Sequence, residues 1–314
     1  MRYLGLAKQI LRGLTGLSSR LDEMGRSVDD QKMLTARLII ASRNAQPIYD
    51  DIRDAEFKVF SQWGDDGIIQ HLIRNVEITS PTFVEFGVED FREANTRFLL
   101  VNDNWKGLVI DGSRSNVESI RRDQISWRHD LTAACAFITA ENINELIAAN
   151  GFAGELGLLS IDIDGNDYWV WEAIDVVSPS IVVVEYNSVF GSRRAVTIPY
   201  EPDFRRAAAH RSNLYHGCSL RALHLLACRK GYVFVGSNSA GNNAYFIRRD
   251  KVGRIAPVDV AAGYVESRFR ESRDAAGRLT HLSGSARLGE IGELPVFDVE
   301  ENRLIKVKEI EDPR

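Results

Sequence analysis

Short apolar runs alternate with helix-like patterns through the middle of the chain, from residue 57 to residue 250. In the segments between the runs, apolar residues recur every three or four positions, which is the spacing of an amphipathic helix. Strands that follow one another at intervals of roughly 20–30 residues, with helices between them, indicate βαβ units and a mostly parallel sheet. Because the runs are continuously apolar, they fit burial on both faces of that sheet. The five predicted strands are Thr82–Val88, Gly107–Asp111, Ser126–His129, Leu158–Asp164 and Ile181–Glu185.

The last two predicted strands break this alternation. Tyr232–Val235 and Ala244–Ile247 are joined by Gly236–Asn243, a segment rich in Gly, Ser and Asn. They are therefore expected to form an antiparallel hairpin. A predicted helix, Leu220–Arg229, precedes them. The pattern as a whole predicts an α/β fold with a mostly parallel sheet, a C-terminal antiparallel hairpin and helices on both faces.

The two ends of the chain differ from this middle part. Residues 1–56 are predicted to form a helical extension, residues 57–250 the α/β domain, and residues 251–314 a C-terminal extension that is more charged and less periodic. Residues 1–20 contain four basic residues and no acidic one, with leucines at roughly helical spacing. This first segment is either a helix that rests on an anionic membrane surface or a helix that packs on the body or on a second subunit.

The composition is that of a soluble globular chain. Its 314 residues are 44% hydrophobic and carry a formal net charge of −5. A mildly acidic chain without basic blocks is a poor candidate for nucleic-acid binding, which depends on neutralising phosphates. The three cysteines show no CxxC spacing and no even disulfide pattern, so reduced thiols are expected. No apolar run reaches the ~18–20 residues that span a bilayer. The protein is therefore expected in the cytoplasm, either free or peripheral to the inner face of the membrane.

Glycine and acidic residues stand at the ends of the first two predicted strands, where open α/β sheets bind ligands. Gly87 would let the backbone approach a ligand closely, and Asp111 is placed to accept hydrogen bonds from both hydroxyls of a ribose. The loop after Gly87 lacks the further glycines of the dinucleotide motif G-x-G-x-x-G and carries Glu89, Asp90 and Glu93 instead. These carboxylates would repel a pyrophosphate but tolerate a ligand that bears an ammonium group. Together with the terminal hairpin, this favours S-adenosylmethionine over NAD.

Four segments resemble those of FkbM-like class I methyltransferases, in particular bacterial relatives found with polysaccharide genes. They are Thr82–Gly87, Trp105–Ser113, Leu159–Tyr168 and Ile181–Asn187, with SQWGDDGIIQHL ahead of them and YHGCSLRAL behind. The most specific part is LLSIDIDGNDYWVW, and the resemblance covers roughly residues 57–250. It implies a Rossmann-like methyltransferase fold, S-adenosylmethionine as methyl donor and a hydroxyl acceptor on a sugar or glycoconjugate.

The resemblance also implies a set of cofactor-binding residues. Glu85 and Gly87 match the first cofactor motif, and Asp111 matches the ribose-binding acid. Asp130, just past the third predicted strand, falls where the adenine is commonly held. The simpler alternative is that Glu85 and Asp111 are only acidic strand ends of an ordinary α/β core. The full set of predicted cofactor-binding residues is Glu85, Gly87, Asn95, Asp111, Gly112, Ser113, Asp130 and Asp162.

Acidic residues also gather at the ends of the fourth and fifth predicted strands. Because residues two apart in a strand face the same way, Asp162 and Asp164 are expected to project from one side of the sheet. Glu185 ends the neighbouring strand, and Asn187 follows two residues on. These four side chains form a predicted oxygen-ligand site for Mg²⁺ or another hard cation, which would polarise an acceptor hydroxyl. A metal-free acid/base role and a purely structural role remain as alternatives.

His216 is the candidate for a separate base, and the predicted catalytic residues are Asp164 and His216. An unperturbed histidine titrates near pH 6.5, which suits proton abstraction at neutral pH. His216 lies at the end of a predicted acceptor lid, residues 188–217, since long loops in compact domains are usually functional. The lid is rich in arginines, which either serve a phosphorylated or uronic-acid acceptor or are simply solvated: Arg193, Arg194, Arg205, Arg206 and Arg211.

Two functional hypotheses from different classes follow. The leading one is an S-adenosylmethionine-dependent O-methyltransferase that acts on a sugar hydroxyl of a saccharide or glycolipid-linked precursor. The second is a noncatalytic binding or scaffolding protein of a glycan-assembly complex. It would keep the fold and use its two ends to bind partners or further copies of itself. A weaker third hypothesis is a nucleotide-sugar oxidoreductase that uses NAD.

Overall fold

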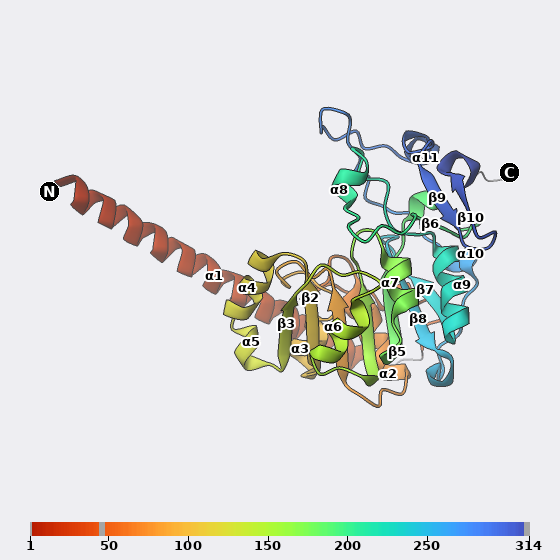
Figure 1. Ribbon diagram of the computed structural model, residues 1–314. Helices are drawn as coiled ribbons and strands as arrows, with labels where there is room; N and C mark the ends of the chain where they lie inside the picture. Colours follow the sequence, from red (N-terminus) through yellow and green to blue (C-terminus); the bar gives the residue numbers. More distant parts are fainter. Residues whose placement is uncertain (1, 44–47, 311–314) are drawn as a thin grey trace. The chain divides into compact units, whose positions relative to one another are not determined.

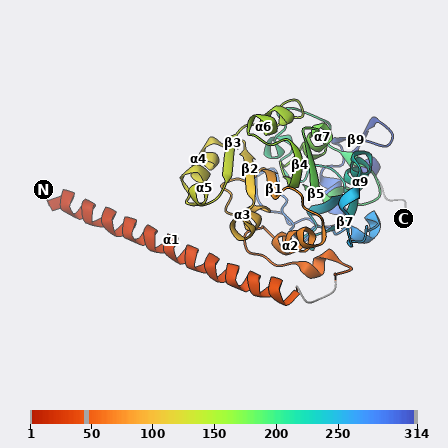
Figure 2. The ribbon, with the colours of Figure 1, turned by 90° about the horizontal axis from the view of Figure 1, so that it is seen from below.

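The computed structural model describes residues 2–43 and 48–310, without the side chains of residues 2–19 and 22. The chain forms two compact units, Met1–Pro47 and Ile48–Arg314. The first unit consists of one long helix, α1 (Arg2–Arg43), drawn in red in Figure 2. None of the helices in the described ranges is both long enough and apolar enough to cross a membrane. Since the side chains of residues 1–19 lie outside the described part, the predicted membrane contact of residues 1–20 stays a prediction.

A seven-stranded sheet forms the centre of the second unit (Figure 1). Its strand order is β3-β2-β1-β4-β5-β8-β7. The first five strands in this order pair in parallel, whereas β8 runs antiparallel to both of its neighbours. The prediction of a mostly parallel, Rossmann-like sheet with a C-terminal antiparallel hairpin is confirmed. The strands are β1 (Thr82–Phe86), β2 (Lys106–Asp111), β3 (Leu131–Cys135), β4 (Gly154–Ile161), β5 (Val177–Glu185), β7 (Tyr232–Ser237) and β8 (Asn243–Arg248).

Helices cover both faces of this sheet, as predicted (Figure 2). Successive side chains of β5 point to opposite faces of the sheet, so both faces are apolar. Val182 and Val184 belong to one hydrophobic core, and Val183 belongs to the other. One core is closed by α6 (Ile143–Ala149), α7 (Asp167–Ala173) and α9 (Leu220–Lys230). The other is closed by α2 (Asp65–Asn75), α3 (Arg97–Asp103), α4 (Arg114–Arg122) and α5 (Ile125–Arg128).

The third strand lies later in the chain than the sequence predicted. The segment expected as a strand, Ser126–His129, is mostly the short helix α5, and β3 begins only at Leu131. The side chain of Asp123 accepts a hydrogen bond from the backbone N–H of Ile125 (2.8 Å), which starts the helical turn. Ile125 is buried while Trp127 is 73% exposed, so the apolar residues of this segment do not form the continuous buried face of a strand.

The predicted lid and the C-terminal extension fold together into a second, smaller sheet. In this sheet β9 pairs antiparallel with both β6 and β10 (Figure 1). A third hydrophobic cluster joins lid residues such as Phe190 and Leu214 to residues of the extension such as Val296 and Ile305. The three strands are β6 (Val196–Thr197), β9 (Pro295–Asp298) and β10 (Arg303–Lys306). The short helices of this second unit are η1 (Ile52–Ala55), η2 (Ser188–Phe190), α8 (Arg206–Ala209), η3 (Arg249–Lys251), α10 (Val260–Gly263), α11 (Ser285–Glu290) and η4 (Val307–Ile310).

Candidate active site

A cavity of about 530 Å³ lies at the carboxyl ends of β1, β2, β4 and β5. This edge of an open α/β sheet is where ligands bind. Its wall combines strand ends with the loop after β3, with α8 and with one residue of the C-terminal extension. Among the described residues that line it, Arg206 is the one basic side chain. The acidic lining residues are Glu85, Glu89, Glu93, Asp111, Asp162, Asp164, Glu185 and Glu271.

Gly87 allows β1 and β4 to end side by side at this cavity. Its φ is +70°, in the left-handed region that favours glycine. A Cβ atom at this position would lie 1.6 Å from the backbone carbonyl oxygen of Asp162. The backbone of this turn therefore lines the cavity directly, which is the close approach that the sequence predicted for Gly87.

The carboxylate of Glu85 holds the loop that follows β1. It accepts hydrogen bonds from the backbone N–H groups of Asn95 (2.8 Å) and Thr96 (3.0 Å) and from the hydroxyl of Thr96 (2.5 Å). Burial raises the pKa of Glu85, and these hydrogen bonds oppose the rise. Thr96 is also the N-cap residue of α3. Both Glu85 and Asn95 line the cavity, and their predicted contact with the cofactor stays a prediction.

Asp111 ends β2 and lines the cavity, as predicted. Its two oxygens accept backbone N–H groups from Glu89 (2.9 Å) and Ser113 (2.7 Å). Asp111 also accepts from Nδ2 of Asn116 (3.2 Å). Because a carboxylate has about four lone-pair sites, Asp111 retains capacity for one hydroxyl of a ribose. Gly112 lines the cavity beside it, whereas Ser113 is not a lining residue and caps α4 by accepting from the N–H of Asn116 (3.4 Å).

The prediction that Asp130 holds the adenine is wrong. Asp130 precedes β3 and lies at its amino end, opposite to the edge that carries the cavity. Its side chain is 68% exposed and pairs with the ammonium group of Lys106 at 3.9 Å. The error follows directly from the misplaced third strand. The residues after β3 that do line the cavity are Ala136, Phe137 and Ile138, which the sequence analysis missed.

Asp162 and Asp164 do not project from one face of a strand. β4 ends at Ile161, so both residues belong to the following loop, and Asp164 has a φ of +56°. The loop is shaped by Asp167, whose carboxylate accepts backbone N–H groups from Ile163 and Gly165, both at 2.9 Å. Burial raises the pKa of Asp167 to about 6. Strand alternation therefore does not apply here, although both predicted acids line the cavity.

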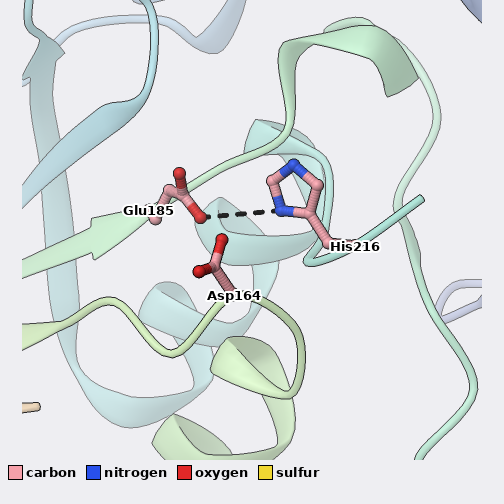
Figure 3. Close-up of side chains that lie close together, drawn as sticks. All are labelled: Asp164, Glu185 and His216. Carbon is pink, nitrogen blue, oxygen red and sulfur yellow. Dashed lines mark ion pairs between the residues drawn. The ribbon is translucent and has the colours of Figure 1, made fainter. Parts of the chain in front are cut away.

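Asp164, Glu185 and His216 converge at the end of β5 (Figure 3). Each offers one ligand atom, and these atoms all lie within 4.8 Å of one another. The Nδ1 atom of His216 is 3.6 Å from Oε2 of Glu185, too long for a hydrogen bond, and it has no hydrogen-bond partner in the described part of the chain. The sequence predicted all three residues as functional but did not predict that His216 would join the two acids.

Burial and like charge set the protonation of this cluster. Burial raises the pKa of Asp162 and of Glu185 well above the usual range of carboxyl groups. The negative charge of Asp164 adds to the rise in pKa at Asp162, and the charges of Asp162 and Asp164 add to the rise at Glu185. Burial, with Arg206 nearby, lowers the pKa of His216, so its imidazole is neutral. The site therefore holds acceptor atoms without a full complement of counter-charge, which favours the entry of a cation.

Asn187, a predicted metal ligand, is engaged in other hydrogen bonds in the structure. Its Oδ1 accepts the backbone N–H of Val189 (3.0 Å), and its Nδ2 donates to the carbonyl oxygens of Leu214 (2.9 Å) and His216 (3.0 Å). Asn187 is buried and does not line the described cavity. Its Nδ2 instead fixes the loop that carries His216, because both of its N–H groups donate to carbonyl oxygens of that loop.

The arginines of the lid mostly pair with acids of the protein itself. Arg206 binds the carboxylate of Asp164 at 2.6 Å and also donates to the carbonyl oxygen of Asn213. Arg194 pairs with Asp298 at 2.7 Å. Arg211 pairs with Glu290 at 2.8 Å, and Arg205 lies over the ring of Phe137. An anionic acceptor is therefore not needed to explain the basic composition of the lid.

The chain matches no protein-family model and no curated protein. Solved structures with a similar arrangement include an S-adenosylmethionine-dependent methyltransferase from Clostridium acetobutylicum (9% identity, 58% of this chain and 89% of that chain, TM-score 0.38). A second is a SAM-dependent methyltransferase from Aquifex aeolicus (10% identity, 55% and 85% covered, TM-score 0.34). A third is the N-terminal domain of EvdMO1 with SAH bound (8% identity, 60% and 80% covered, TM-score 0.37). Since these TM-scores are below 0.5, the fold is assigned from the strand order itself.

Proposed function

We propose that the protein is an S-adenosylmethionine-dependent O-methyltransferase of the FkbM-like type, acting on a sugar hydroxyl of a saccharide or glycoconjugate. One observation carries the proposal. A single cavity is lined by Asp111, at the strand end suited to a ribose, and by Asp164 and Glu185, which follow or end strands two and three places away in the sheet. His216 lies against these two acids. A methyltransferase needs these two regions side by side, because the methyl donor and the acceptor oxygen must meet at reacting distance.

At the donor end, four features suit S-adenosylmethionine. Asp111 would accept a ribose hydroxyl, and the tight turn at Gly87 brings backbone close to the methionine portion. Glu89 on the following loop suits the positive charges of the ammonium and sulfonium groups, whereas Glu93 already pairs with Lys58 at 3.2 Å. Phe137, after β3, offers an aromatic ring for the adenine in the place where Asp130 was expected.

At the acceptor end, Asp164, Glu185 and His216 would hold a divalent cation that polarises the acceptor hydroxyl. The orphaned Nδ1 of the buried His216 fits this role, since neutral imidazole is a good metal ligand. A ligand set with one imidazole suits Mn²⁺ or another first-row transition metal better than Mg²⁺. Without a cation, the neutral His216 would instead accept the hydroxyl proton directly.

Titration with SAH tests the donor end. Wild type is expected to bind SAH, and Asp111→Ala to bind it at least about tenfold more weakly, because a charged hydrogen-bond acceptor is lost. Asp130→Ala is the matched control, since it removes an aspartate from the opposite end of the sheet and should leave the affinity unchanged. Absence of SAH binding, or equal losses in both variants, would reject the proposed function.

Direct Mn²⁺ binding, followed by electron paramagnetic resonance, tests the acceptor end. His216→Ala should weaken Mn²⁺ binding, whereas His224→Ala, on α9 outside the cavity, should not. If Mn²⁺ does not bind the wild type and chelation leaves methyl transfer intact, the cation is excluded and the direct role of His216 remains.

A further inference from the structure

Two buried asparagines give the acceptor end of the cavity a fixed hydrogen-bonding character. The Nδ2 of Asn243 donates to Oδ1 of Asp65 at 3.0 Å, and the Nδ2 of Asn166 donates to the carbonyl oxygen of Glu201 at 2.8 Å. Both partners can only accept, so the orientation of each amide is determined. Both residues are 4% exposed and line the cavity.

The remaining oxygen of each amide has no hydrogen-bond partner within the described residues. A buried carbonyl oxygen that lacks a partner is costly, so a ligand that donates hydrogen bonds would relieve both atoms. Asn243 stands opposite Glu185 across the β5–β8 pair, and Asn166 follows the loop of Asp164. The two oxygens therefore belong to the acceptor end rather than to the donor end.

The C-terminal extension adds a further carboxylate to the same end. Glu271 lines the cavity, accepts a hydrogen bond from Nδ2 of Asn213 at 3.2 Å and pairs with Arg273 at 3.0 Å. Its charge helps to raise the pKa of the Arg206 guanidinium, so it faces the same part of the cavity as Arg206. Arg206 itself is already engaged with Asp164 and with the backbone of Asn213.

A divalent cation alone does not account for the two asparagines and Glu271. Asn166, Asn243 and Glu271 lie outside the cluster of Asp164, Glu185 and His216 that would hold the cation. Among the described residues, eight acidic side chains and one basic side chain line the cavity. An anionic acceptor would be repelled by this lining, and an acceptor with only neutral hydroxyls would bring no positive charge to it. An ammonium group brings a positive charge and three hydrogen-bond donors with no acceptor, which complements both the carboxylates and the two free oxygens.

We propose that the acceptor is an amino sugar, whose protonated amine is bound by the wall formed by Asn166, Asn243 and Glu271 while a hydroxyl of the same molecule meets the methyl donor. This inference rests on the proposed function for the identity of the reaction. The amine is a recognition group here, and the wall selects the charged amine over its acetylated form, which is neutral and carries a carbonyl oxygen.

Matched pairs of ligands test the inference by calorimetry on the full chain, at neutral pH, with EDTA present and SAH at saturation. The probes are glucosamine, galactosamine and mannosamine, each paired with its N-acetylated form. In at least one pair the amine is expected to bind about tenfold more tightly than its acetylated partner. Equal or tighter binding of the acetylated form in every pair, or no binding of any amine, would overturn the inference.

Two glutamate variants locate the effect. Glu271→Gln should reduce the preference for the amine several-fold, whereas Glu293→Gln should leave it unchanged, because Glu293 pairs with Lys306 and Lys308 away from the cavity. Equal effects of the two variants would reject the wall as the binding site. SAH binding is measured separately in the same protein, and its absence would reject the proposed function. If SAH does not bind, the amines are compared with their acetylated forms in titrations without SAH. The inference about the amine is thereby tested separately from the proposed function.

Discussion

Replacing Gly87 with alanine should be far more damaging than an ordinary glycine substitution. The added Cβ would lie 1.6 Å from the carbonyl oxygen of Asp162, and both atoms belong to backbone or are bonded to it. No flexible side chain can move aside, so the ends of β1 and β4 would have to separate. The left-handed φ of +70° adds its own cost for any residue with a Cβ.

The magnitude follows from a comparison with Gly154, whose φ is +72° and whose Cβ would meet nothing within 4 Å. Gly154→Ala therefore measures the conformational cost alone, about 1–2 kcal/mol. Gly87→Ala adds the overpacking cost of the clash, about 1–3 kcal/mol more. The expected total loss for Gly87→Ala is about 2–5 kcal/mol in the free energy of unfolding.

Urea unfolding of wild type and the two variants gives these free energies, and SAH titration gives the functional consequence. We expect Gly87→Ala to lose SAH binding while Gly154→Ala retains it, since only the first displaces the turn at the cavity. Equal destabilisation of the two variants would show that β1 and β4 do not approach as closely as the structure has them. Retained SAH affinity in Gly87→Ala would refute the role of this turn in cofactor binding.

Three further predictions concern buried polar groups. Burial raises the pKa of Asp66 to about 6, so the folded state binds the proton of this carboxyl group more tightly than the unfolded state does. The contribution of Asp66 to the free energy of unfolding therefore falls as pH rises from about 4 to about 6. The difference in unfolding free energy between wild type and Asp66→Asn should change by about 3 kcal/mol over that window in urea titrations, and a constant difference would contradict the assignment. Ser219→Ala removes the N-cap of α9 and leaves the buried N–H of Val196 without its hydrogen-bond partner. A loss of about 2–3 kcal/mol in the free energy of unfolding is expected in urea titrations. A loss below about 1 kcal/mol would show that the hydroxyl is dispensable. Asn187→Ala should free the loop of His216 and weaken Mn²⁺ binding about tenfold, and unchanged affinity would argue against a positioning role.

The central sheet could be predicted from the sequence because its strands are continuous apolar runs with local boundaries. Val182, Val183 and Val184 alternate between two cores, and a short run of β-branched residues is typical of a strand that is buried on both faces. The positions of Gly87 and Asp111 then follow, because residues at the carboxyl ends of parallel strands meet at one edge. The hairpin of β7 and β8 was equally predictable, since Gly, Ser and Asn mark the turn between these strands.

The third strand and the loop after β4 were not predictable in the same way. Leu131–Cys135 is short and only Ala133 within it is buried, so its hydrophobic signal is weak. Asp130 was placed at the wrong end of this strand as a result. The positive φ of Asp164 depends on the hydrogen bonds that Asp167 makes to the loop, and no periodicity records such a turn. Asp162 and Asp164 were therefore assigned to the site correctly but with the wrong geometry.

His216 and Arg206 reach the acids through contacts that are distant in sequence. β6 of the lid pairs with β9, where Thr197 stands opposite Phe297, and this pairing anchors a segment that has no strong local pattern. Asn187 then ties the loop of His216 to the end of β5. The sheet thus positions Asp164 and Glu185, whereas the C-terminal extension positions the lid that carries His216. The cluster of these three residues therefore forms only when the sheet and the extension have both folded. Removing the extension should for that reason abolish the acceptor end while leaving the donor end, at β1 and β2, in place.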